Sequence, residues 1–283
     1  MKKLMLALAL PFALAATMGL APAFAQEPMK VTIATEGSSP PWNSTDSTGK
    51  LIGFDVDLGY ELCRRMGATC TFVAQDWDGI IPALTVGKYD AIMGGMSITE
   101  KRKKTIDFST PYAVGFNQIV MRKGLGLPPT DAKAKLNLTQ MDASKQATID
   151  TLRTALSGRT LGVLRSSNSE VVVNELFGKV ATIRSYDTNE NMTMDVAAGR
   201  VDGTLADFFV LKTFLESKDG DVAEFYGPML NGGPWGPGAG IGIRKTDPQL
   251  KAAFDKAIAS ANEDGAIKAL TEKWFGMDMS PPK

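Results

Sequence analysis

Histidine is absent from this chain of 283 residues, and cysteine occurs only twice. Without histidine the chain cannot carry a Ser-His-Asp triad, a Cys-His catalytic pair or a His-based zinc site. Basic and acidic residues balance, with 31 of each, whereas a protein that binds nucleic acid normally has a basic face. We therefore expect no nucleic-acid partner, no metal site, no cofactor and no catalytic residue.

Long apolar runs are also absent from the sequence after residue 20. The chain begins M-K-K, residues 4–20 are largely apolar, and residues 23–25 read A-F-A. This pattern predicts a secretory signal peptide, residues 1–25, that is cleaved after Ala25 and sends the protein to the periplasm. An uncleaved membrane helix is the alternative, which the short apolar stretch and Pro11 disfavour. No later stretch approaches the ~20 apolar residues that a span needs.

The two cysteines, Cys63 and Cys70, are seven residues apart. In an exported chain this spacing predicts a disulfide. The bond would join the end of a predicted helix near Arg65 to a predicted strand that starts at Thr71. The alternative is a pair of free thiols.

Strand-like and helix-like segments alternate along the chain, as is typical of α/β proteins. The predicted strands cover residues 30–34, 71–74, 90–93, 118–121, 160–164, 182–186, 201–206 and 241–244. The predicted helices cover residues 53–65, 79–85 with Asp78 as cap, 142–156, a segment after 165–169 that runs to 177, 189–199, a segment after 207, and parts of 248–275. This order predicts mostly parallel sheets that bind ligands at the carboxyl ends of their strands.

The run G-G-M-S-I-T-E-K-R at residues 94–102 directly follows a predicted strand. Two glycines let the backbone approach a ligand closely, and Ser97 brings an N–H and a hydroxyl. Arg102 can clamp a carboxylate with two parallel hydrogen bonds. The run therefore predicts a site for the α-carboxylate of an amino acid. Alternatively, Arg102 is a surface residue of the basic run 101–104.

Several stretches together resemble the family 3 solute-binding proteins of polar amino-acid ABC importers. They are G-F-D-V-D-L at 53–58, W-D-G-I-I-P-A-L at 77–84, Y-D-A-I-M-G-G-M-S-I-T-E-K-R at 89–102, L-G-V-L at 161–164, A-G-R-V-D-G at 198–203 and D-G-A-I-K-A-L-T-E-K-W-F at 264–275. Within the family, I-A-T-E-G at 33–37 and P-W-N at 41–43 are similar to the branch that binds basic amino acids and opines.

The resemblance implies an α/β fold of the two-lobed periplasmic binding protein type (type II), with two doubly wound sheets joined by two hinge strands near 112–116 and 237–241. Residues 26–114 and 239–283 would form lobe 1. Residues 115–238 would form lobe 2, with an insert near 123–159. The implied partners are a small-molecule amino acid or opine and the membrane permease of an ABC importer, and the protein is expected to be a monomer.

The resemblance also implies which residues hold the ligand's carboxylate. Arg102 would clamp it, assisted by the N–H and hydroxyl of Ser97 and by the backbone N–H of Asn168. Leu164 and Ser167 would line the same side of lobe 2.

Other residues would hold the ammonium group and the side chain of the ligand. Asp207 and the carbonyl of Gly95 would accept from the ammonium, Trp77 would stack on the side chain, and Glu36 would read a basic group. The remaining predicted site residues are Ser39, Gly94, Met96 and Arg165. Each role has an alternative: Asp207 as a helix N-cap, Trp77 and Met96 as core residues, and Glu36 as a solvated side chain.

Two positions bear on the identity of the ligand. Ser39 stands where the basic-amino-acid binders usually have a tyrosine, and Arg165 would either point inward toward a second carboxylate or point to solvent. Glu36 favours a cationic ligand because an unpaired buried carboxylate is costly. Arginine, ornithine or lysine is the first prediction, an opine the second, and glutamine or histidine the third.

An exported dehydratase on this fold, using Glu36 or Asp207 as general acid, is the alternative from another class, and a sensor role is compatible with the same chain.

Overall fold

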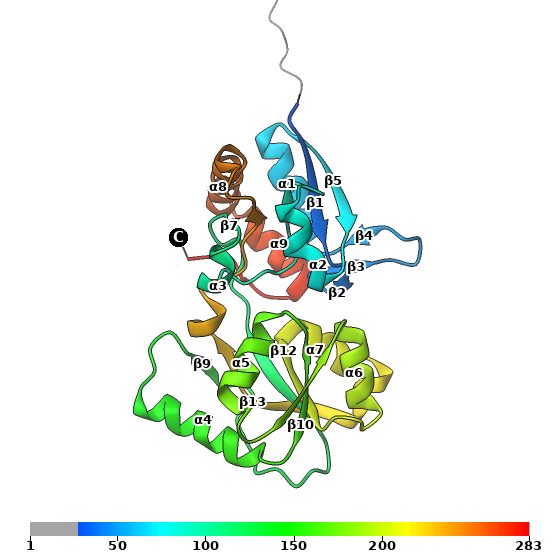
Figure 1. The fold of residues 1–283 in the computed structure, drawn as a ribbon, viewed down its shortest axis with the longest axis vertical. Helices are drawn as coiled ribbons and strands as arrows, with labels where there is room; N and C mark the ends of the chain where they lie inside the picture. Colours follow the sequence, from blue (N-terminus) through cyan, green and yellow to red (C-terminus); the bar gives the residue numbers. More distant parts are fainter. Residues whose placement is uncertain (1–27, 283) are drawn as a thin grey trace, which may run out of the picture.

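The computed structural model describes residues 28–282, so the predicted signal peptide and its cleavage site after Ala25 lie outside the described residues. The described chain forms two lobes, each a β-sheet with helices packed against it, one above the other in Figure 1. This is the predicted two-lobed α/β fold. Within residues 28–282 we find no helix that combines the length and the apolar character needed to span a bilayer.

The upper lobe in Figure 1, here called lobe 1, is built on a five-stranded sheet in the order β5-β1-β6-β14-β7. Its strands are β1 (Lys30–Thr35), β5 (Thr69–Ala74), β6 (Ala91–Ile92), β7 (Asp107–Phe108) and β14 (Gly242–Ile243). Its helices are α1 (Phe54–Met66), α2 (Trp77–Thr85), α3 (Glu100–Lys103), α8 (Pro248–Glu263) and α9 (Ala266–Phe275). Phe54, Leu58 and Leu62 recur on one face of α1 and are fully buried, as their fourfold spacing predicts.

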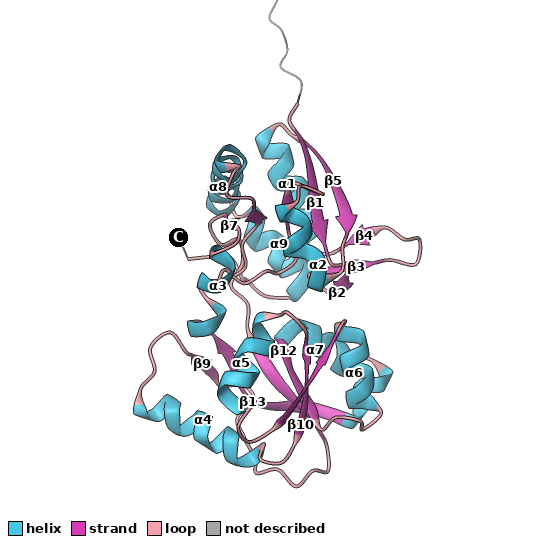
Figure 2. Ribbon diagram, in the orientation of Figure 1, coloured by secondary structure: helices cyan, strands magenta, loops and turns pink. Residues whose placement is uncertain are grey.

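The lower lobe, lobe 2, is built on a six-stranded sheet in the order β11-β10-β12-β8-β13-β9. Its strands are β8 (Asn117–Arg122), β9 (Lys135–Asn137), β10 (Thr160–Leu164), β11 (Thr182–Tyr186), β12 (Gly203–Asp207) and β13 (Ala223–Asn231). Its helices are α4 (Ala143–Ala155), α5 (Asn168–Phe177), α6 (Asn189–Ala197) and α7 (Phe208–Leu215), with the short 3-10 turns η1 (Lys218–Val222) and η2 (Gly233–Trp235). Figure 2 shows α4 at the lower left of lobe 2 and α6 at its right.

The sheets are mixed rather than mostly parallel, which corrects the prediction. In lobe 1, β14 runs antiparallel to β6 and β7, and in lobe 2, β8 runs antiparallel to β12 and β13. The reason lies in the crossings between the lobes. The start of β8 pairs with the end of β12, Asn117 opposite Asp207, and the start of β14 pairs with the end of β6. A strand that enters from the other lobe therefore runs away from the edge where the parallel strands end.

The chain passes between the two sheets between β7 and β8 and again between β13 and β14. The two crossing segments lie side by side, because Ala113 and Ala239 form an isolated antiparallel bridge. Tyr112 N–H donates to the Ala239 carbonyl at 2.8 Å, and Ala239 N–H donates to the Ala113 carbonyl at 2.9 Å. A pair of short extended segments is a suitable hinge. The exact lobe boundaries stay a prediction.

One local prediction needs correction, and several strands were not predicted. After β1 the chain forms β2 (Ser38–Ser39) and β3 (Asn43–Thr45), which make a small sheet with β4 (Leu51–Ile52). Helix α2 begins at Trp77, so Asp76 and not Asp78 is its N-cap residue. The nine-residue strand β13 was not predicted.

Within the segment 123–159, α4 and β9 pack onto lobe 2, and the description of this segment as an insert stays a prediction. Its helix α4 is capped by Asp142, whose side chain accepts from Lys145 N–H, and Ile149 and Leu152 of this helix are buried in the lobe 2 core. Strand β9 adds to the edge of the sheet beside β13.

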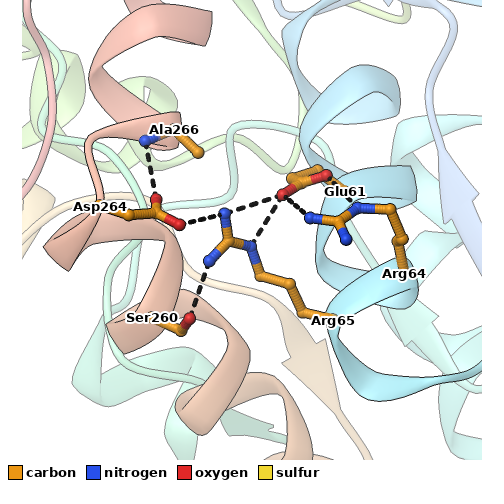
Figure 3. A network of polar contacts seen from close by, with 6 residues as sticks. All are labelled: Glu61, Arg64, Arg65, Ser260, Asp264 and Ala266. Atoms are coloured by element: carbon orange, nitrogen blue, oxygen red, sulfur yellow. Dashed lines mark hydrogen bonds and ion pairs between the residues drawn. The ribbon is translucent and has the colours of Figure 1, made fainter.

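The C-terminal helices are fastened to α1 in lobe 1. Arg65 donates to Glu61 within α1, to Ser260 on α8, and forms an ion pair of 2.7 Å with Asp264 between α8 and α9 (Figure 3). The predicted disulfide between Cys63 and Cys70 is present and joins α1 to β5. Both ties hold α1 in place.

Candidate ligand-binding site

A cavity lies between the lobes, where the parallel strands of both sheets end. Its empty volume is about 920 Å³ with the open mouth included, a usual size for a small-molecule site. It brings together all the predicted site residues except Met96 and Arg165. These residues are Glu36, Ser39, Trp77, Gly94, Gly95, Ser97, Arg102, Leu164, Ser167, Asn168 and Asp207.

Arg102 supplies the positive charge of the cavity. The Thr99 hydroxyl accepts from Arg102 N–H and so starts the short helix α3. The guanidinium donates to the carbonyls of Ser97 at 3.1 Å and Ser166 at 3.4 Å, and it lies 5.5 Å from the centre of the Trp77 ring. Burial lowers the pKa of Arg102 to about 10. No ion pair among residues 28–282 includes Arg102, so its remaining N–H groups are available to a ligand carboxylate.

Lobe 2 presents the N-terminus of α5 to the same cavity. Ser167 is the N-cap and accepts from Glu170 N–H at 3.1 Å. Asn168, the first helical residue, lines the cavity and fixes its side chain through a 2.6 Å bond to the Pro234 carbonyl. The first N–H groups of a helix lack helical partners and carry a partial positive charge. Arg102 and α5 can therefore hold one anion from both lobes.

Asp207 is both an N-cap and a cavity residue, so the two alternatives for this residue are not exclusive. Its Oδ1 accepts from Phe209 N–H at 2.9 Å and Val210 N–H at 3.2 Å, which starts α7. Burial raises the pKa of Asp207 to about 6, although hydrogen bonds from the Trp42 indole and from these N–H groups lower it. The cap occupies Oδ1, and the carboxylate, which also accepts from the Trp42 indole, can accept from a cationic group of a ligand through Oδ2.

Glu36 follows β1 and supplies the second negative charge. Its Oε2 accepts from the Ser39 hydroxyl at 2.5 Å, and its Oε1 is buried without a partner. Desolvation by burial raises the pKa of Glu36, while the hydroxyls of Ser39 and of the nearby Ser38 lower it. A buried carboxylate oxygen with no partner is costly unless a ligand donates to it.

The aromatic walls come from Trp77 and Trp42. Trp77 also packs against the lobe 1 core, so it fills both of its predicted alternatives. Trp42 was missed as a cavity residue, although it belongs to the P-W-N stretch. A Cβ at Gly95, whose φ is +58°, would lie 3.2 Å from the Trp42 ring. This position therefore requires glycine, which brings the Gly95 backbone next to the cavity.

Lobe 2 adds polar residues that the sequence reasoning also missed. Asn117, Ser169 and Asn189 line the cavity. Asn189 follows β11, just as Ser167 follows β10 and Asp207 ends β12. Considering the N-terminus of the helix that follows each parallel strand would have identified Asn189, the first residue of α6.

Two predicted site residues lie elsewhere. Met96 is fully buried in the lobe 1 core with Ile80 and Ile98, because its side chain points away from the cavity that its neighbours Gly95 and Ser97 line. Arg165 does not point inward. It is about half exposed and pairs with Asp187 and, at 3.6 Å, with Asp78 of lobe 1.

The family model for the bacterial extracellular solute-binding proteins, family 3, matches residues 31–277. An octopine-binding periplasmic protein of Rhizobium meliloti is 39% identical over 280 residues, which cover 92% of this chain and 94% of that protein. A lysine/arginine/ornithine-binding periplasmic protein of Escherichia coli (strain K12) is 34% identical over 282 residues, which cover 99% of each chain. Among solved structures, an ancestral arginine-binding protein bound to arginine superposes with a TM-score of 0.73 at 30% identity, covering 87% of this chain and 98% of that one.

Proposed function

Because this chain belongs to family 3 of the bacterial extracellular solute-binding proteins, we propose that it captures a cationic amino acid in the cleft between its lobes. Arginine, ornithine and lysine are the proposed ligands. The protein would work in the periplasm, where its named relatives work, and would deliver the ligand to the permease of an ABC importer.

The observation that carries this proposal is the charge of the cavity. Among the described residues that line it, the acidic ones are Glu36 and Asp207, and the basic one is Arg102. A ligand with one carboxylate and two cationic groups gives each of these charges a partner. Neutral amino acids would leave a carboxylate unpaired and largely desolvated, which is costly.

We assign the roles accordingly. Arg102, Ser97 and the α5 N–H groups at Asn168 would hold the carboxylate. Asp207, with the Gly95 carbonyl, would hold the α-ammonium group. The ligand side chain would extend along Trp77 to the free Oε1 of Glu36.

Binding would close the lobes because the ligand contacts both of them. Glu36, Trp77 and Arg102 belong to lobe 1, whereas Asn168 and Asp207 belong to lobe 2. A ligand that contacts both lobes binds the closed form better and shifts the population toward it. The closed form is then the state that a permease would recognise.

An opine is the second candidate, and the octopine-binding relative at 39% identity favours it. An opine of this type has a second carboxylate. The cavity would have to bind that group with Arg102, which already serves the first, or with backbone N–H groups. We rank opines second for this reason. An exported dehydratase would need a general acid at a leaving hydroxyl, and both candidate acids are better used as acceptors for cations.

Isothermal titration calorimetry of refolded, ligand-stripped protein tests the proposal. Citrulline is the matched neutral probe because a ureido group replaces the guanidinium of arginine with the same shape. We expect arginine, ornithine and lysine to bind, and citrulline to bind at least about tenfold more weakly than arginine. If octopine binds and arginine does not, the proposed ligand becomes an opine. If neither binds, both proposed ligand classes are refuted.

The variant Glu36→Gln tests the role of the carboxylate. We expect it to bring the affinities for arginine and citrulline close together, since it removes the negative charge and keeps the shape. Glu190→Gln, a change at an exposed glutamate of α6, is the control. A Glu36→Gln variant that keeps the arginine preference of the unmodified protein would remove Glu36 from the recognition of the side chain.

A further inference from the structure

Asn189 reaches across the cleft from lobe 2 to lobe 1. It is the first residue of α6 and only 7% exposed. Its Nδ2 donates to the Ser39 hydroxyl at 2.9 Å, and the two residues are 150 positions apart in the sequence. The Ser39 hydroxyl donates in turn to Glu36 Oε2 at 2.5 Å. An amide, a hydroxyl and a carboxylate thus form one hydrogen-bond chain across the cleft.

The donors and acceptors of this hydrogen-bond chain can be arranged in only one direction. A serine hydroxyl has one proton and two lone pairs, and the amide nitrogen of asparagine only donates. When Asn189 donates to Ser39, the lone proton of Ser39 is directed to Glu36. One carboxylate oxygen, Oε2, is then satisfied by the protein. The other, Oε1, is buried without a partner and remains for the ligand.

We propose that Asn189 is a specificity-determining residue that selects ligands with a cationic side chain by fixing the hydroxyl of Ser39 against Glu36. This proposal rests on the proposed function and adds to it a lobe 2 residue that acts on the far end of the ligand. The small side chain of Ser39 leaves room for the amide to approach. Selection of the side chain would therefore be completed only when the lobes are closed.

A simpler role for Asn189 would be to hold the lobes together. A hydrogen bond across the cleft would then favour closure on any ligand, and its loss would reduce the affinities for arginine and citrulline by the same factor. A role through Glu36 predicts a different result. Without the oriented hydroxyl, Glu36 is less favoured as a carboxylate in its buried position, and only the cationic ligand depends on that charge.

Titration calorimetry with arginine and citrulline separates the two roles. We expect Asn189→Ala to reduce the ratio of the two affinities by about fivefold, the effect of one hydrogen bond between neutral groups. Asn191→Ala, an exposed position on the same helix, should leave the ratio unchanged. Equal weakening of both ligands by Asn189→Ala would overturn the proposal.

A double-mutant cycle tests whether the chain acts as a unit. We expect Ser39→Ala to reduce the ratio as well, and the double variant to lose no more than Ser39→Ala alone. If the two substitutions reduce the affinity ratio independently, so that the loss in the double variant is the product of the two single losses, the three groups do not act as a unit. Asn189→Leu keeps the side-chain volume and removes both polar groups, and it serves if Asn189→Ala does not fold, as judged by thermal melting.

The failures of the two proposals are distinguishable. If the unmodified protein binds no cationic amino acid, the proposed function fails and this inference fails with it. If the unmodified protein prefers arginine to citrulline and changes at Asn189 leave that preference intact, only this inference fails.

Discussion

At the scale of single residues, the cavity holds charges that the protein itself leaves without a charged partner. Arg102 donates only to carbonyl oxygens, and Glu36 keeps one oxygen free. Such groups are unfavourable in the empty cleft because they have lost water without gaining a counter-ion. A ligand that supplies the missing charges removes this cost. The site is therefore arranged for one class of ligand before the ligand arrives.

Arg102→Ala should weaken arginine binding at least about 100-fold, since it removes the charged partner of the carboxylate. Lys103→Ala is the control, because the Lys103 ammonium pairs at the surface with Glu100 at 2.9 Å and does not line the cavity. That control should change the affinity less than about twofold. Calorimetric titration of both variants measures this difference, and similar losses in both would show that the carboxylate binds elsewhere.

Arginine binding should depend on pH through Asp207, whose pKa burial raises to about 6. The ammonium of the ligand favours the ionised carboxylate, so binding is full above this pKa and weakens as Asp207 takes up a proton below it. We expect about a tenfold loss of affinity per pH unit below pH 6. Burial raises the pKa of Glu36 in the same direction. Titrations between pH 5 and pH 8 measure the effect, and an affinity that stays constant over this range would contradict it.

At the scale of elements, a buried polar network holds together the loops that carry the site. Asp55, at the start of α1, is fully buried and accepts from the Tyr112 hydroxyl at 2.7 Å and from Asn43 Nδ2 at 3.0 Å. Tyr112 accepts from Gly95 N–H, and Asn43 accepts from Gly37 N–H. Helix α1 thus fixes the loop after β1, which carries Glu36, and the loop after β6, which carries Ser97.

Tyr112→Phe should affect stability and binding together. It removes the hydroxyl that accepts from the Gly95 N–H and donates to Asp55, which should cost about 2 kcal/mol of unfolding free energy. Because the Gly95 loop is released, we also expect arginine affinity to fall by about tenfold.

Urea unfolding and calorimetry on the same samples measure both effects. Tyr60→Phe is the control, since Tyr60 lies on α1 and is 48% exposed. Lower stability with unchanged affinity in Tyr112→Phe would mean that the network supports the fold without positioning the loops.

Local sequence pattern was sufficient to predict the elements that have a clear hydrophobic period and the cavity residues that lie together in one short motif. Strands β10 and β11 and the capped helix α4 are examples, as are Gly95, Ser97 and Arg102 in a single run. Strand β13 was missed because it contains Gly227 and Pro228, which are rare inside strands. The structure accommodates them with a register shift between Tyr226 and Leu230.

Residues whose role depends on contacts with the other lobe could not be predicted from local sequence pattern. Asn189 gains its role from Ser39, which lies 150 residues earlier. Arg165 was considered as an inward-pointing residue, yet Asp78 and Asp187 pair with it from two different elements. Neither partner is close to Arg165 in sequence, so only the folded chain shows where its guanidinium points.

At the scale of the whole molecule, several side-chain contacts join the lobes besides the two crossing segments. Arg102 donates to the Ser166 carbonyl, Asn189 donates to Ser39, and Arg165 pairs with Asp78 at 3.6 Å. Contacts of this kind exist only when the lobes are close. They therefore stabilise the closed form, and an equilibrium between open and closed forms sets the apparent affinity.

The pair of Arg165 and Asp78 offers a way to test this link, because neither residue lines the cavity. Both side chains are partly exposed, 48% and 42%, so the pair should contribute modestly and be screened by salt. We expect Asp78→Asn to weaken arginine binding about threefold at low ionic strength. In about 0.5 M salt the difference from the unmodified protein should largely disappear.

The loss should appear mainly in the dissociation rate, since opening of the lobes must precede release of the ligand. Stopped-flow fluorescence can measure this rate through the tryptophans that line the cavity. Glu100→Gln, which breaks a surface pair within lobe 1, is the matched control for the loss of one acidic charge. If Asp78→Asn and Glu100→Gln behave alike, or if the loss persists at high salt, the pair does not hold the lobes together. The closed form would then depend on the ligand and on the contacts of Arg102 and Asn189.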